Sequence, residues 1–178
     1  GADVSLAFFT NLEALSYYAR SRTTGRSGDE ESYRGRLFYN GDKIGLDADY
    51  LKVGNEFNPE AGFLARRGFR RQFLLARLSP RPKLPGIRRL FWDASLDNIE
   101  GAVRGELQTR TASTTFRIDF QSGDILTANF GHHEDRQDTA FRLAGGLTVR
   151  PGIYRFGQGT LSYQMGSQRK LTGTLSAT

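Results

Sequence analysis

The feature that most constrains this chain is an alternation of apolar and charged residues that reverses at a tight turn. Positions 33, 35, 37 and 39 are aromatic, aliphatic or glycine, and arginine occupies positions 34 and 36. Asn40-Gly41 follows, and both residues tolerate the positive φ angles of a hairpin turn. Beyond the turn, Asp47 and Asp49 alternate with apolar residues. Because successive side chains of a strand point to opposite faces, the segment predicts a hairpin with one apolar and one charged face.

The same rhythm continues along the chain and indicates an all-β protein without a confidently predicted helix. The fold class we predict is an antiparallel up-and-down meander of roughly ten or eleven long strands, part of an outer-membrane-type β-barrel. In the hairpin arm 154–165 the apolar positions change parity, which predicts a β-bulge at Gly157 or Gly159. The expected strands cover residues 2–9, 12–22, 33–40, 43–52, 68–78, 87–96, 102–120, 125–141, 154–165 and 169–177.

Composition excludes several classes of protein. The mean hydropathy is −0.50, and no window approaches the roughly 18 apolar residues of a membrane-spanning helix, whereas a barrel strand needs only about ten alternating residues. Cysteine is absent, so disulfides and thiolate chemistry are excluded. The net charge is +6, but the arginines are spaced like one face of a strand and do not cluster as in a nucleic-acid-binding tail. We therefore predict no nucleic-acid partner.

The chain begins and ends within alternating segments. We interpret residues 1–178 as a single β-barrel segment, an internal fragment of a longer protein.

A membrane barrel and a soluble sheet with one wet face both produce this alternation. Long strands, aromatic residues near strand ends and charges in mid-strand favour the barrel, because a water-filled lumen tolerates charge. The aromatic residues concerned are Tyr17, Tyr18, Tyr33, Tyr39, Tyr50, Phe91, Trp92, Tyr154 and Phe156. The adjacent pairs Arg70-Arg71 and Arg88-Arg89 favour the soluble sheet, since one member of each pair points to the apolar side.

Four stretches resemble a known family: residues 53–63 (VGNEFNPEAGF), 66–71, 120–124 and 151–156. They are similar to the C-terminal domain of unknown function in bacterial envelope proteins that carry an N-terminal family-nine carbohydrate-binding module. The resemblance implies an outer-membrane-like β-barrel and supplies no catalytic residues. The carbohydrate-binding module is not in this chain, so polysaccharide binding is expected only through a domain outside it.

Candidate sites are few. His132 and His133 are adjacent, so a strand places them on opposite faces, and His132 with Glu134 is about one or two ligands short of a zinc site. We predict no metal, no cofactor and no catalytic residue. The best candidate for binding is the loop at 55–62, where Glu56, Asn58 and Glu60 offer acceptors and Arg66 follows. The competing interpretation is a loop packed on the barrel rim, with Glu60 paired to Arg66 or Arg67.

The leading hypothesis is a non-enzymatic segment of a bacterial outer-membrane β-barrel in the cell envelope. It would act as membrane anchor or pore for an exported carbohydrate-binding module, with membrane lipid on its apolar face. An open lumen rich in arginine would favour anionic solutes. The alternatives are a soluble all-β module that binds polysaccharide or protein, and the non-catalytic part of a glycoside-processing enzyme.

Overall fold

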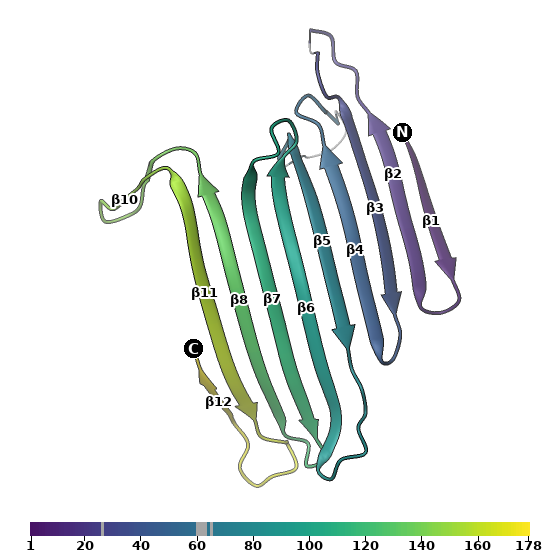
Figure 1. Cartoon of the computed structure of the whole chain (residues 1–178), viewed down its shortest axis with the longest axis vertical. Coiled ribbons are helices and arrows are strands. Elements are labelled where there is room, and N and C mark those ends of the chain that lie inside the picture. The colour runs from purple at the N-terminus through teal and green to yellow at the C-terminus, as the bar shows by residue number, and fades with distance from the viewer. Residues whose placement is uncertain (26, 60–63, 65) are drawn as a thin grey trace.

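A computed structural model describes residues 1–25, 27–59, 64 and 66–178. In these residues there is no helix, and ten strands form one antiparallel sheet in which every strand pairs with its neighbours in chain order (Figure 1). The expected up-and-down meander is therefore confirmed. The ten strands are β1 (Ala2–Phe8), β2 (Leu12–Arg20), β3 (Glu31–Asn40), β4 (Ile44–Val53), β5 (Phe69–Leu78), β6 (Ile87–Gly101), β7 (Leu107–Phe120), β8 (Ile125–Gln137), β11 (Gly152–Gln164) and β12 (Thr174–Ala177).

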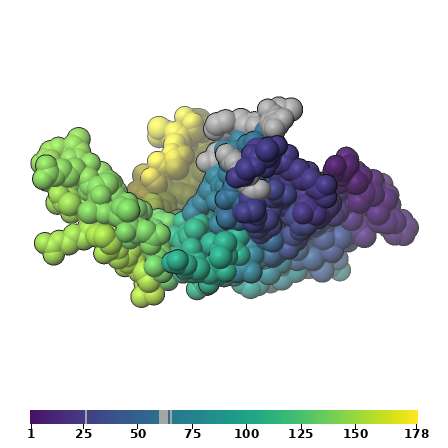
Figure 2. Space-filling view, turned by 90° about the horizontal axis from the view of Figure 1, so that it is seen from above, coloured from purple at the N-terminus to yellow at the C-terminus, as the bar shows by residue number. Residues whose placement is uncertain are grey.

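The connection between β8 and β11 contains a small separate hairpin of β9 (Phe141–Arg142) and β10 (Thr148–Val149). In the view from above, this hairpin and the N-terminal strands lie at opposite ends of one extended layer (Figure 2). Among the described strands, β1 and β12 each pair with one neighbour only, so they form the two edges of an open sheet. The described part of the chain contains no helix that is long and apolar enough to cross a membrane.

The connections at the two ends of the strands differ in length (Figure 1). At one end, here called the turn edge, segments 9–11, 41–43, 79–86, 121–124 and 165–173 are 3 to 9 residues long. At the other, the loop edge, segments 21–30, 54–68, 102–106 and 138–151 are 5 to 15 residues long.

The sheet has almost no apolar interior. Val53 and Phe57, 2% and 9% exposed, are the buried hydrophobic residues among those described. The solvent-accessible surface is 12143 Å², against about 8,700 Å² for a compact folded protein of this mass. The excess, roughly two fifths, arises because a single layer leaves both faces of the sheet open.

Several details of the sequence prediction were wrong. The register between β11 and β8 runs without a shift from Gly152 opposite Gln137 to Gln164 opposite Ile125, so there is no bulge at Gly157 or Gly159. The apolar residues simply change faces along β11. Irregular pairing occurs instead on β6, between Ile87 and Arg89 and between Ile99 and Glu100.

The other differences concern the ends of strands. β6 continues to Gly101, beyond the expected end at 96, and β8 ends at Gln137 and not at 141. The strand expected at 102–120 begins only at Leu107, because residues 102–106 form a turn with Gly105 at a φ of +69°. The final strand begins at Thr174 and not at 169, because the preceding residues belong to a turn that is tied to Asp124.

Candidate functional site: the two faces of the sheet

One face of the sheet, here called the apolar face, carries uninterrupted rows of apolar side chains. The central row consists of leucine and alanine across seven strands, and each residue lies directly opposite the next: Leu6, Ala14, Leu37, Ala48, Leu74, Leu96 and Ala112. The large members of this row remain 42–48% exposed. Nothing in the described chain covers this row, so the sheet exposes a contiguous apolar surface.

A second row crosses the same face nearer the turn edge. It consists of Ile44, Leu78, Trp92, Phe116, Ala128, Leu161 and Ala177. Trp92 is 52% exposed, and its indole Nε1–H donates to Thr114 Oγ1 on the same face at 2.8 Å. The only polar atom of this side chain is therefore satisfied within the sheet, which allows the ring to face a medium without hydrogen-bond partners.

Tyrosines border the apolar face toward the loop edge. Tyr18 lies opposite Tyr33, and the Tyr33 ring stacks on Tyr50 with centroids 6.0 Å apart. Tyr18 donates its hydroxyl hydrogen to Glu31 at 2.8 Å. This arrangement matches the expected aromatic border. Other members of the expected border (Tyr17, Phe91, Tyr154 and Phe156) lie on the opposite face and do not contribute to it.

Charged residues of the apolar face are also confined to the loop edge. Arg155 and Glu134 form a two-pronged pair at 2.9 and 3.2 Å, and Lys52 Nζ lies 2.8 Å from Asp29 in loop 21–30. From this belt to the turn edge, the strand positions of the apolar face are uncharged. The belt consists of Arg20, Glu31, Lys52, Arg70, Glu100, Arg110, Glu134, Arg136 and Arg155.

The opposite face, here called the polar face, is organised by arginine–aspartate pairs between neighbouring strands. Arg36 bonds Asp47 through Nε and Nη2 at 2.8 and 2.7 Å, and Arg71 bonds Asp97 at 2.9 and 2.7 Å. In each pair the arginine reaches diagonally to the residue two positions away from the one directly opposite. The guanidinium of Arg36 also lies 5.3 Å from the ring centre of Phe38. A planar guanidinium group can bond both oxygens of a carboxylate and also stack on an aromatic ring.

These pairs leave the polar face without an excess of arginine. Its regular strand positions hold six arginines (Arg34, Arg36, Arg71, Arg77, Arg89 and Arg117) and eight carboxylates (Asp3, Glu13, Asp47, Asp49, Asp93, Asp97, Asp119 and Asp135). The expectation that this face favours anionic solutes therefore finds no support in its charge.

The binding candidates in loop 54–68 take separate partners. The backbone N–H of Glu56 donates to the Asp29 carbonyl at 3.0 Å, and that of Asn58 donates to Ser21 Oγ at 2.9 Å. Asn58 Oδ1 accepts from Arg67 at 2.7 Å. Glu60 lies outside the described residues, so its expected pairing stays a prediction.

Arg66 reaches in another direction. It donates to Gln108 on β7 and lies 5.8 Å from the centre of the Phe69 ring. The described residues of loop 54–68 pack against those of loop 21–30, and the buried Phe57 lies beside a groove of about 440 Å³ that is lined by residues 19–23 and 57–59. Asn58 and Arg66 thus have separate partners, and whether this loop binds a ligand stays a prediction.

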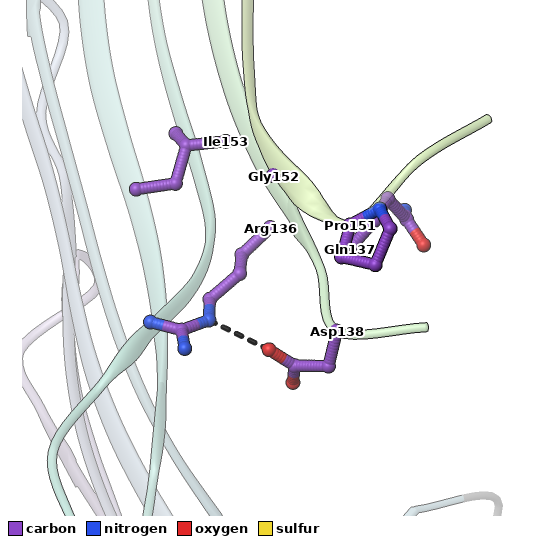
Figure 3. A pocket seen from close by; sticks show the side chains of 6 residues that line it. All are labelled: Arg136, Gln137, Asp138, Pro151, Gly152 and Ile153. Carbon is purple, nitrogen blue, oxygen red and sulfur yellow. Dashed lines mark hydrogen bonds and ion pairs between the residues drawn. The ribbon is translucent and has the colours of Figure 1, made fainter. Parts of the chain in front are cut away.

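A shallow depression lies where β8 and β11 approach the loop edge (Figure 3). Its volume is about 390 Å³, and its two charged residues, Arg136 and Asp138, bond each other with Nε and Oδ1 2.7 Å apart. Gln137, Pro151 and Gly152 form the remaining wall with Ile153. One surface ion pair does not give a ligand a set of converging groups, so we do not assign a binding site to this depression.

The histidines occupy opposite faces, as predicted. His132 lies on the apolar face opposite Ala112, whereas His133 lies on the polar face and stacks on Phe156 with centroids 4.9 Å apart. Glu134 shares the face of His132, and Arg155 holds its carboxylate. In the described residues, no three His, Cys, Asp or Glu side chains converge on a point.

Two carboxylates at the turn edge tie neighbouring turns together. Asp124, 3% exposed, accepts from the Gly166 N–H and the Tyr163 hydroxyl at 2.8 Å each and pairs with Arg169. The Gly166 N–H in particular, followed by Tyr163, Ser122 and Arg169, lowers the pKa of Asp124 far below its ordinary value.

Asp42 has the corresponding role in the adjoining turns. Arg81 and Arg89 both pair with it, and the hydrogen bond from Arg81 lowers the pKa of its carboxyl. Sequence reasoning missed both networks, although the pattern Ser122-Gly123-Asp124 is a turn signal. The Ser122 hydroxyl accepts from the backbone N–H of Asp124 and donates to its carboxylate.

Comparisons with protein-family models, curated proteins and solved structures find no match. The resemblance to the barrel domain that accompanies family-nine carbohydrate-binding modules therefore stays a prediction.

Proposed function

We propose that this chain forms part of the wall of an outer-membrane-type β-barrel, a non-enzymatic segment that anchors a protein in the bacterial cell envelope or lines a pore. The supporting observation is the exposed, uncharged apolar face, bordered at the loop edge by tyrosines and charges. On β7 its uncharged run from Ala112 to Phe120 extends about 26 Å along the strand at about 3.3 Å per residue. An outer-membrane barrel presents an apolar band about 25 Å tall.

In this proposal each face meets a different medium. The apolar face contacts acyl chains, and the paired charges of the polar face line water. Strand hydrogen bonds satisfy the backbone in lipid, except at the outer edges of β1 and β12 and along residues 152–160 of β11, which β12 does not reach. These edges need partner strands. The barrel therefore closes through strands additional to this sheet. An exported carbohydrate-binding module as the anchored partner rests on the sequence resemblance alone.

Adjacent residues of one strand provide the test. Because the chain has no cysteine, Leu74→Cys and Leu75→Cys can each carry a single fluorescent label, at neighbouring positions on the apolar and the polar face. Leu96→Cys and Ser95→Cys form a matched pair on β6. The labelled proteins are refolded into phospholipid vesicles with a quencher attached either to the acyl chains or to a water-soluble carrier.

We expect the lipid quencher to act on labels at 74 and 96, and the aqueous quencher to act on those at 75 and 95. A soluble binding module gives a different result, with no stable partition into vesicles and with positions 74 and 96 buried against another layer. Either failure to partition or quenching without alternation contradicts the proposal.

A further inference from the structure

Lysine is distributed unevenly over the sheet. Three of the four lysines lie in separate connections of the turn edge, and the four loop-edge connections contain none. Each of these three is followed directly by an exposed aliphatic residue: Lys43 by Ile44, Lys83 by Leu84 and Lys170 by Leu171. The aliphatic residues are 56%, 51% and 82% exposed. A lysine followed by an exposed aliphatic residue thus occurs three times at one end of the apolar face.

The acidic residues of these turns are not available to the lysines. The five turn-edge connections contain two carboxylates, Asp42 and Asp124, and both are engaged by arginine. Arg81 holds Asp42, and Arg169 holds Asp124. In the described part of the chain, none of the three lysine ammonium groups forms a hydrogen bond or an ion pair. The turn connections therefore carry a net charge of +3, and their three lysines form no ion pair within the described chain.

The turns that present these lysines are fixed to one another. Ser79, fully buried, donates from its backbone N–H to the Lys43 carbonyl at 2.7 Å and from its hydroxyl to the Asp42 carbonyl at 2.8 Å. Asp124 binds turn 165–173 in the same way through the Gly166 N–H. Because these hydrogen bonds hold the turns in place, the fold sets the positions of the lysines relative to the apolar face.

From these observations we infer that the turn edge docks in the headgroup layer of an anionic phospholipid leaflet. Lys43, Lys83 and Lys170 contact lipid phosphates, and the aliphatic residue after each lysine enters the acyl boundary. Lysine suits this position because its stem can lie along apolar surface while its ammonium group remains hydrated. The inference rests on the proposed membrane-facing role of the apolar face and adds that anionic lipid recognises one particular edge.

The loop edge behaves differently. Its connections hold seven arginines and six carboxylates, close to balance. Several of those carboxylates pair with basic residues of the adjoining strands, as Asp29 does with Lys52 and Asp138 with Arg136. The charged belt beside these connections adds six basic and three acidic residues, and five of its basic residues pair with carboxylates. In the described chain, lysines that have no ion pair and precede an exposed aliphatic residue are therefore found at the turn edge and not at the loop edge.

The experiment compares charge removal at the two edges. The test variant is Lys43→Gln/Lys83→Gln/Lys170→Gln, and Lys43→Arg/Lys83→Arg/Lys170→Arg keeps the charge. The matched control, Arg22→Gln/Arg142→Gln/Arg150→Gln, removes three positive charges from loop-edge residues that form no ion pair within the described chain. Partition is measured by flotation with vesicles of phosphatidylcholine alone and of phosphatidylcholine mixed with phosphatidylglycerol.

We expect the unmodified protein to prefer the anionic vesicles, and the glutamine test variant to lose that preference by roughly 100-fold at low salt, since each basic residue at an anionic surface contributes about 1 kcal/mol. The arginine variant and the loop-edge control keep the preference. An unchanged preference in the test variant, or an equal loss in the control, overturns the inference while leaving the barrel proposal intact. Failure of the unmodified protein to enter either vesicle type contradicts the barrel proposal itself.

Discussion

Arg34 on β3 and Asp49 on β4 form a two-pronged ion pair on the polar face. Nε and Nη2 of the guanidinium lie 2.8 and 2.6 Å from the two carboxylate oxygens, and Asp49 is only 9% exposed. Because the pair spans the two strands diagonally, it fixes their register as well as neutralising the charge. The two charges of this pair are thus satisfied by each other within the polar face.

Breaking this pair from the arginine side is expected to be costly. Arg34→Gln leaves the Asp49 carboxylate shielded from water without its guanidinium, which we expect to lower the free energy of unfolding by about 1–3 kcal/mol. Arg136→Gln removes the arginine of an exposed pair and should change it by no more than about 0.5 kcal/mol. Urea unfolding of the refolded proteins in detergent micelles, followed by Trp92 fluorescence, measures both.

The double variant Arg34→Gln/Asp49→Asn should recover part of the loss, because no unpaired charge remains. Equal costs for Arg34→Gln and Arg136→Gln would show that burial on the polar face has no energetic effect.

A charge placed on the apolar face should distinguish the two surfaces. Leu74→Arg puts a guanidinium in the central apolar row, whereas Leu75→Arg puts one beside it on the polar face, opposite Asp47. In lipid vesicles we expect Leu74→Arg to reduce folding stability by about 2–4 kcal/mol relative to Leu75→Arg. The fraction that folds during a urea titration in vesicles gives the difference. If Leu75→Arg is the more damaging variant, the apolar face does not contact lipid.

The single tryptophan reports on the same surface. Trp92 lies on the apolar face and is 52% exposed. Its emission should therefore shift to shorter wavelength when the protein enters vesicles, and lipids with brominated acyl chains should quench it. Phe91→Trp/Trp92→Phe moves the indole to the polar face and should abolish acyl-chain quenching. Emission that does not change on addition of vesicles would argue against lipid contact at this row.

The hairpin at 33–50 could be predicted fully from sequence because its alternation is unbroken and its turn is Asn40-Gly41. Both faces of β3 and β4 appear in the structure as the alternation indicates. On β11 the prediction failed, because an aromatic residue such as Phe156 fits either an apolar face or a polar face that supplies a ring partner. Here His133 supplies that partner, and it lies on β8.

The contacts between turns could not be predicted for a different reason. Asp124 and Gly166 are 42 residues apart and meet because β7, β8 and β11 are adjacent in the sheet. A sequence pattern defines each turn locally, but it contains no information on which turns become neighbours. For the same reason the candidate residues Asn58 and Arg66, close in sequence, have partners on different elements.

Acid should weaken the hydrogen bonds between Asp124 and turn 165–173. Because the folded environment lowers the pKa of this carboxyl, its contribution to stability is complete above its ordinary pKa of 3.8 and is lost as the pH falls below that value toward the folded pKa. The NMR shift of the Gly166 amide proton should therefore stay constant from pH 7 to about 4 and move only at lower pH. In Asp124→Asn this titration should be absent. A midpoint at or above 3.8 would mean that the hydrogen bonds do not favour the ionised form.

A substitution at Gly54 tests whether loop 54–68 is held against loop 21–30. Its N–H donates to the Glu31 carbonyl at 2.8 Å, and a Cβ atom at this position would overlap the backbone carbonyl of Asp29. Gly54→Ala must therefore separate loop 54–68 from loop 21–30, and we expect a loss of about 1–3 kcal/mol in the free energy of unfolding. Gly35→Ala is the matched control, since a Cβ there meets no atom within 4 Å.

Limited proteolysis and urea unfolding together show whether loops 54–68 and 21–30 stabilise each other. In Gly54→Ala we expect faster cleavage at Arg22 and Arg67, in the two loops that lose contact, whereas Gly35→Ala should be cleaved like the unmodified protein. Because the strands below the loops keep their register, the effect should remain at the loop edge and leave the Arg34–Asp49 pair in place. If Gly54→Ala leaves stability and cleavage unchanged, the two loops do not brace each other, and loop 54–68 again becomes a candidate for binding.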